Sequence, residues 1–152
     1  MKKGLLIFLQ IIIVLIALGV LFFILWEPRL EGHNVNATTF EIYFQDKFLA
    51  YAYMASVLFF TILYQIFKIL EHIKKNKKFS TASVRALQTI KFCASTIILF
   101  LIAAEAYLFI VQRHKDDIAG GVFMSNVLIL LNIIIITTAN ISEKSWRKYI
   151  KK

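Results

Sequence analysis

Residues 5–26 read LLIFLQIIIVLIALGVLFFILW, an apolar run interrupted only by Gln10. About 20 apolar residues in a helix are enough to cross the hydrocarbon core of a bilayer. The run predicts a transmembrane helix. A cleaved signal peptide has an apolar core of roughly 7–15 residues followed by small side chains. This run is longer and ends in bulky residues, so we expect it to remain as the first span.

Three more apolar stretches of similar length follow, at residues 48–67, 87–111 and 118–139. Hydrophobic residues make up 59% of the 152-residue chain, and the mean hydropathy is +0.71. Soluble globular proteins contain about 45–50% apolar residues. The pattern predicts one all-α membrane domain, an antiparallel bundle of four transmembrane helices. The remaining segments would be an outer loop at 27–47, a cytoplasmic loop at 68–86 and a basic tail at 140–152.

The basic residues are distributed unevenly between the two sides of this topology. Of the 18 Lys and Arg residues, all but four lie on the side of the two termini; the exceptions are Arg29, Lys47, Arg113 and Lys115. Because Lys and Arg accumulate on the cytoplasmic side, we expect a cell (inner) membrane protein with both termini in the cytoplasm. The net charge of +9 then reflects topology and contact with anionic headgroups. We expect no nucleic-acid partner.

Glu105 is the one carboxylate inside the third span, in the run FLIAAEAYLFIVQ at residues 100–112. Ionisable groups at such positions are costly and usually face the interior of a bundle. Counted from the short connection to the fourth span, Glu105 reaches the depth of Ser125 and Asn126. We therefore predict a hydrogen bond between Glu105 and one of these two. The expected set of buried polar residues is Glu105, Ser125, Asn126, Asn132 and Gln10.

Three roles remain open for Glu105: helix packing through hydrogen bonds, binding of a proton or ligand, and contact with a partner protein. Proton relays normally need a chain of titratable groups, and only this carboxylate lies deep in a span. That observation argues against a pump.

Polar residues also mark the two ends of the third and fourth helices. Arg85, Gln88 and Lys91 form a strip on the first turns of the third helix, which would contact lipid headgroups or a cytoplasmic partner. His114, Asp116 and Asp117 form a possible outer-face site. No two potential ligands there have a recognised metal-binding spacing, so we expect neither a metal nor another cofactor.

Two local signals concern the basic side. Ser80 or Thr81 can cap the third helix at its N-terminus. The tail SEKSWRKYIKK, residues 142–152, resembles a short interfacial helix in which Glu143 and Arg147 pair one turn apart.

Three motifs together resemble a known family. They are NVNAT at 34–38, FSTASVRALQTIKF at 79–92 and DDIAGG at 116–121. In order and spacing they are similar to the small four-span prokaryotic membrane proteins grouped as domain of unknown function 2975. The resemblance implies the architecture and, because some members look to be encoded beside small helix-turn-helix regulators, signalling across the membrane. Members often end in an acidic-polar stretch resembling ENDLT, which the basic tail replaces here.

No nucleophile–base pair, phosphate-binding loop or pair of catalytic carboxylates can be assembled from these residues, so we do not expect an enzyme. The first hypothesis is an accessory or signalling membrane protein that acts through a membrane or cytoplasmic partner. The alternative is a small transporter or ion-conducting oligomer that uses Glu105 and requires self-association. A third, a lipid-modifying enzyme, would have to use Glu105 with His114, Asp116 and Asp117.

Overall fold

The structure is a computed structural model, and it describes residues 3–26, 47–76, 79–112 and 118–150. The described elements are all helical, as predicted. They are α1 (Lys3–Trp26), α3 (Lys47–Lys74), α4 (Thr81–Tyr107), a π-helical turn η3 (Leu108–Gln112) that continues α4, and α5 (Ala119–Ile150). The predicted outer loop lies almost wholly outside the described residues.

The helices extend beyond the apolar spans at one end of the molecule. The second helix, α3, continues to Lys74, α4 begins at Thr81, and α5 continues to Ile150. At 1.5 Å per residue the 32 residues of α5 measure about 48 Å, whereas the hydrocarbon core of a bilayer is about 30 Å thick. Hydropathy marks where apolar side chains stop, but the backbone hydrogen bonds of a helix continue through polar sequence.

The expected helix in the tail and its Glu143–Arg147 pair are present, but the helix is not a short one of its own. Residues 142–150 continue α5 without a break, and Trp146 is buried in the core rather than exposed to headgroups. The reason is that Trp146 packs on Phe79, which lies between α3 and α4, with ring centroids 6.4 Å apart. This contact holds the end of α5 against the bundle.

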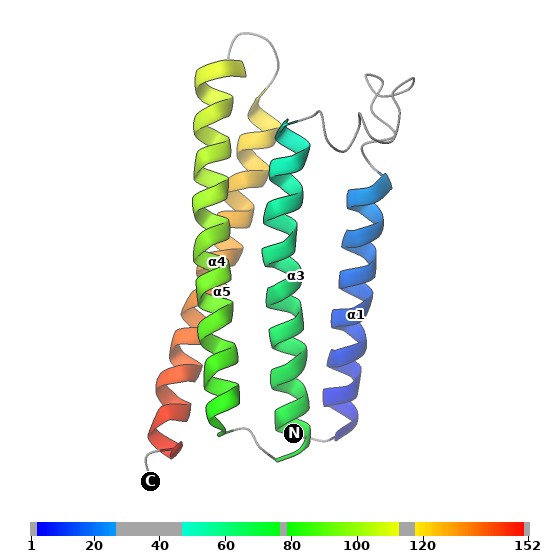
Figure 1. The fold of residues 1–152 in the computed structure, drawn as a ribbon, viewed down its shortest axis with the longest axis vertical. Coiled ribbons are helices and arrows are strands. Elements are labelled where there is room, and N and C mark those ends of the chain that lie inside the picture. Colours follow the sequence, from blue (N-terminus) through cyan, green and yellow to red (C-terminus); the bar gives the residue numbers. More distant parts are fainter. Residues whose placement is uncertain (1–2, 27–46, 77–78, 113–117, 151–152) are drawn as a thin grey trace.

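The four long helices pack antiparallel, in the order α1, α3, α4, α5 (Figure 1). The contact between α4 and α5 is the most extensive, followed by that between α3 and α4, while α1 packs mainly on α3. The first residue of α1 and the last of α5 lie at the same end of the bundle (Figure 1). We call this the basic end; its described basic residues include Lys3, Lys68, Lys74, Lys75, Arg85, Lys91, Lys144, Arg147 and Lys148.

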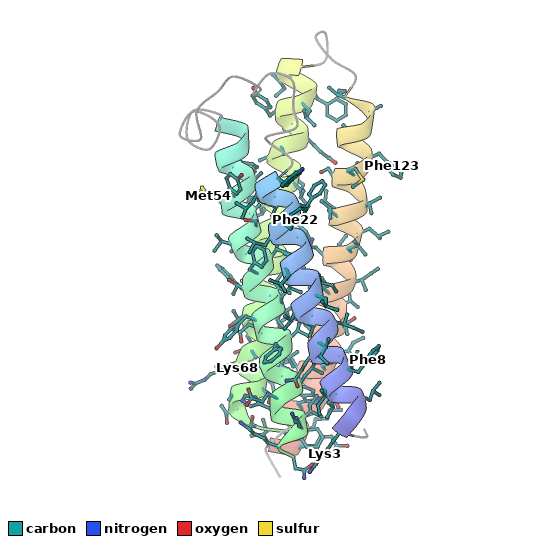
Figure 2. The ribbon with its side chains drawn as sticks, turned by 90° about the vertical axis from the view of Figure 1, so that its right-hand side faces the viewer. Lys3, Phe8, Phe22, Met54, Lys68 and Phe123 are labelled. Atoms are coloured by element: carbon teal, nitrogen blue, oxygen red, sulfur yellow. The ribbon has the colours of Figure 1, made fainter. Side chains whose placement is uncertain are left out.

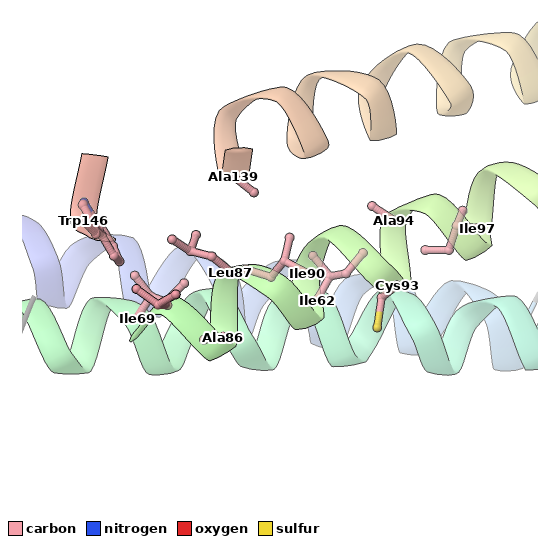
Figure 3. Packing of buried hydrophobic residues seen from close by; sticks show 11 residues of the cluster. Ile62, Ile69, Ala86, Leu87, Ile90, Cys93, Ala94, Ile97, Ala139 and Trp146 are labelled. Carbon is pink, nitrogen blue, oxygen red and sulfur yellow. The ribbon is translucent and has the colours of Figure 1, made fainter. Parts of the chain in front are cut away.

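The core follows α4 along the half of the bundle nearer the basic end (Figure 3). Ala94 is fully buried towards one end of this cluster, and Trp146 lies at the other end, near Ile69 and Leu87. Ser80, one of the two predicted caps, marks the start of α4. The Oγ of Ser80 accepts a hydrogen bond from the backbone N–H of Ser83 at 3.2 Å. The buried hydrophobic cluster comprises Ile62, Ile69, Val84, Ala86, Leu87, Ile90, Cys93, Ala94, Ile97, Ala139 and Trp146.

Large apolar side chains cover the outside of the bundle, as Phe8, Phe22, Met54 and Phe123 illustrate (Figure 2). All four long helices are long and apolar enough to cross a membrane. In a bilayer such side chains face lipid acyl chains, which are their most favourable surroundings. Only Leu6 and Gln10 of α1 are buried, so this helix is held by the least packing.

Candidate functional site

The carboxylate of Glu105 contacts the facing helix. Asn126 of α5 donates a hydrogen bond from Nδ2 to Oε1 of Glu105 at 2.9 Å, and also donates to the backbone oxygen of Val122 at 2.9 Å. This is one of the two contacts expected from matched depth. Glu105 is half-buried and Asn126 is exposed. The pair therefore lies at the surface of the bundle, about 10 Å from the end of η3.

Two neighbours of this pair on α5 differ in how their polar groups are satisfied. Ser125 is 7% exposed, and within the described part of the chain its Oγ is buried without a hydrogen-bond partner. Asn132 is also buried, but its Nδ2 donates to the backbone oxygen of Leu128, one turn earlier on its own helix, at 2.9 Å. Asn132 thus bonds within α5, and among the described residues it makes no hydrogen bond with Glu105.

Gln10, the last member of the expected set, lies on a different part of the bundle. It is buried on α1, about 10 Å from the start of that helix, whereas Glu105 lies about 36 Å from the start of α4. Both helices start at the basic end. The two side chains are therefore separated by about 25 Å along the bundle axis, and the expected residues do not form one cluster.

The backbone changes form next to Glu105. After Tyr107 the α-helix gives way to the π-helical turn η3, and the N–H of Leu108 is shared between the oxygens of Ala104 and Glu105. Such turns are rare and occur often at functional sites. Leu108 also closely approaches α5, since a Cβ added at Gly121 would lie 3.3 Å from Leu108 Cδ1. A small residue at 121 permits this close packing.

A second polar site lies at the basic end, and we call it the Glu143 cluster (Glu143, Lys91, Arg147 and Gln88). The Glu143 side chain is buried on α5. Its Oε2 lies 2.6 Å from Lys91 Nζ, and its Oε1 accepts hydrogen bonds from Arg147 at 2.8 Å and from Gln88 at 3.1 Å. Lys91 also donates to Asn140 Oδ1 at 2.9 Å. The Glu143 carboxylate thus pairs with Lys91 of α4 and with Arg147 of its own helix, and the first of these ion pairs links α4 to α5.

This cluster changes the interpretation of the polar strip on α4. Gln88 and Lys91 both bind Glu143 of α5, although Gln88 remains exposed and Lys91 half-buried. Contact of the strip with headgroups or a partner stays a prediction. Arg85 is exposed, as a strip residue should be. Sequence reasoning found the pair of Glu143 with Arg147 but missed its contact with α4. The depth argument used for Glu105 predicts this contact too, because Gln88 and Glu143 are equally far from the connection between α4 and α5. The same holds for Lys91 and Asn140.

The residues of the possible outer-face site, His114, Asp116 and Asp117, lie outside the described residues. Within the described ranges, no three His, Cys, Asp or Glu side chains are placed to hold a metal ion. The described His72 instead joins α3 to the cap of α4, with Nδ1 3.0 Å from Ser83 Oγ.

Comparison with known proteins agrees with this architecture. Residues 27–144 match the model of the family described as "Protein of unknown function (DUF2975)". The chain is also 34% identical over 139 residues to the "Uncharacterized membrane protein YoaS" of Bacillus subtilis (strain 168). The matched residues cover 91% of this chain and 86% of that protein. No solved structure matches the chain. The resemblance inferred from three short motifs is confirmed, and this multi-pass membrane protein belongs to the DUF2975 family.

Proposed function

We propose that the protein is an accessory or signalling protein of the cell membrane, with both termini in the cytoplasm, that acts by binding another membrane protein. The positive-inside rule supports this orientation, because the described basic residues concentrate where α1 begins and α5 ends. The polar contacts of the Glu143 cluster join α4 to α5 within the protein. The surface of the spans then remains for contact with a partner protein.

The observation that carries the proposal is the exposure of the Glu105–Asn126 pair on an apolar surface. Asn126 is exposed and Glu105 half-buried, while Ile102 and Phe123 beside them are also exposed. Polar groups that face acyl chains lose the hydrogen bonds of water and cost several kcal/mol each. A helix of a partner that offers a hydrogen-bond donor to Glu105 removes this cost, and the surrounding apolar side chains provide the packing.

Photo-crosslinking in native membranes tests this proposal. A photoreactive amino acid is placed at Ile102 or Phe123. The matched control is Phe92, which is at least as exposed and lies on α4 nearer the basic end. We expect a protein adduct of defined mass from the first two positions, reduced in the Glu105→Gln and Asn126→Leu variants. Adducts with lipid alone at all three positions would contradict the proposal.

A small ion-conducting oligomer is the second candidate, and the same pair favours it, because a half-buried carboxylate within a span is a typical ion-pathway residue. Here the partner is a second copy of the chain, so the adduct should have twice the mass of the protein. Ion flux into vesicles that contain the purified protein, measured for wild type and Glu105→Gln, then decides between a conducting oligomer and a signalling one.

A further inference from the structure

The outward face of α5 at the basic end carries an open groove that the Glu143 cluster does not use. Its volume is about 600 Å³, and its lining residues are Ile141, Lys144, Ser145, Lys148 and Tyr149. They recur at intervals of three and four, so they share one face of the helix. Glu143 and Trp146, by contrast, are buried against the rest of the bundle. The groove is thus separate from the intramolecular ion pairs.

The groove is positively charged and has no carboxylate among its lining residues. Lys144 and Lys148 are exposed and form no ion pair within the described part of the chain, whereas Lys91 and Arg147 are both paired with Glu143. Like charges one turn apart on a helix repel each other. An anion placed between the two ammonium groups removes this repulsion, and the hydroxyls of Ser145 and Tyr149 can donate hydrogen bonds to it.

One wall of the groove is held in place by aromatic packing. The ring of Tyr149 stacks on Phe79, with centroids 4.4 Å apart, and Phe79 also contacts Trp146 of the core. The tyrosine therefore has little freedom to lose when a ligand binds. A side chain that is already ordered adds less entropic cost to binding than one that must be ordered.

The position of the groove along α5 corresponds to the headgroup layer of a bilayer. A hydrocarbon core of about 30 Å takes up roughly 20 residues, which places its boundary near Ala139 if α5 enters at Ala119. Ile141 and Lys144 then lie within the next several ångströms, at the level of lipid phosphates. Lys148 is one turn further out, and its long side chain can bend back to that level. From Ile141 to Lys148 the lining of the groove changes from apolar to cationic. A phospholipid likewise changes from apolar acyl chains to an anionic headgroup along the same direction.

We propose that this groove is a binding site for an anionic glycerophospholipid of the surrounding membrane. Lys144 and Lys148 bind the phosphate, Ser145 and Tyr149 donate hydrogen bonds to it, and Ile141 contacts the glycerol and the first acyl carbons. This is a defined site for one lipid molecule, and it differs from the diffuse attraction of a basic surface to anionic headgroups. It does not depend on the Glu105–Asn126 pair.

The test uses the full chain in nanodiscs of phosphatidylcholine that contain a small fraction of phosphatidylglycerol, with bound lipid counted by native mass spectrometry. We expect the Lys144→Gln/Lys148→Gln variant to lose most of the bound lipid, because both ammonium groups that contact the phosphate are removed. The corresponding double arginine variant should retain it, because guanidinium groups also bind phosphate. The matched control is Lys68→Gln/Lys74→Gln, which removes the same charge from α3 at the same end, and which should retain the bound lipid.

Two outcomes would overturn the proposal. Equal losses in the two glutamine variants would mean that only the general surface potential attracts lipid. Displacement of the bound lipid by inorganic phosphate at similar concentrations would mean that the groove is a site for free phosphate. The Ile141→Ser variant separates these sources further, since it should weaken phosphatidylglycerol binding and leave any binding of inorganic phosphate unchanged. Unaltered helical circular dichroism would verify that each variant is folded.

Discussion

Asn126 and Asn140 lie two heptads apart on α5, and both contact α4 in the same antiparallel register. Asn126 donates to Glu105, and Asn140 accepts from Lys91, which is two heptads before Glu105 on α4. Gln88 and Glu143, three residues further towards the basic end on each helix, keep the same register. A repeat of seven residues is typical of helices that pack at a small angle with interlocking side chains. Polar contacts thus define the alignment of α4 with α5 along most of their length.

This register predicts the proximity of Ile98 and Ile133, which lie one heptad from each asparagine contact. In a Cys93→Ala background, the pair Ile98→Cys and Ile133→Cys should form a disulfide on mild oxidation, which gel mobility under non-reducing conditions detects. Leu99→Cys with Ile133→Cys is the control, because Leu99 is exposed and is not at the heptad position that Lys91 and Glu105 share. Faster crosslinking of the control pair would show that the register is different.

The Glu143→Gln variant should lower the free energy of unfolding by about 1–3 kcal/mol, since a buried carboxylate that accepts charge-assisted hydrogen bonds from Lys91, Arg147 and Gln88 is lost. Unfolding in mixed detergent micelles measures this change. The matched control is Glu71→Gln, which breaks an exposed ion pair with Lys75, one turn further along the chain. We expect no measurable effect from the control, and equal effects would refute a special role for the Glu143 cluster.

A double-mutant cycle with Glu105→Val and Asn126→Val should give a coupling free energy of about 0.6 kcal/mol and at most about 1.7 kcal/mol, as found for hydrogen bonds between membrane helices. Stability is again measured by unfolding in mixed micelles. The parallel cycle with Asn132→Val in place of Asn126→Val should give no coupling, because Asn132 bonds to its own helix. Coupling in this second cycle would mean that the polar contacts differ from those described.

Gly121→Val should destabilise the packing of α5 on η3 by about 1–3 kcal/mol, as overpacking of a close contact does. The added side chain meets Leu108 Cδ1, which is 3.3 Å from the position of a Cβ. The neighbouring Gly120→Val is the control, because a Cβ at Gly120 meets nothing within 4 Å. Thermal unfolding in detergent should separate the two variants, and the expectation fails if Gly120→Val is the more harmful.

The contact between Glu105 and Asn126 could be predicted because it depends on one quantity that the sequence contains, the distance of each residue from a short helix connection. The same reasoning extends to Lys91 with Asn140 and to Gln88 with Glu143. Hydropathy, however, places Lys91 and Glu143 near the span ends, where solvated or headgroup-bound side chains are expected. The burial of Glu143 depends on α5 continuing as a helix without a break past the apolar span.

The sequence by itself determined that four helices are long and apolar enough to cross a membrane, that they alternate in direction, and that α4 is capped at Ser80 or Thr81. Each of these follows from local properties: the length of apolar runs, the distribution of charge and the side chain before a helix. The tertiary structure alone decided that Trp146 joins the core, that Glu143 is enclosed by two cations, and that Gln10 lies far from Glu105. These features depend on which faces of separate helices meet and at what register, and packing between helices determines both.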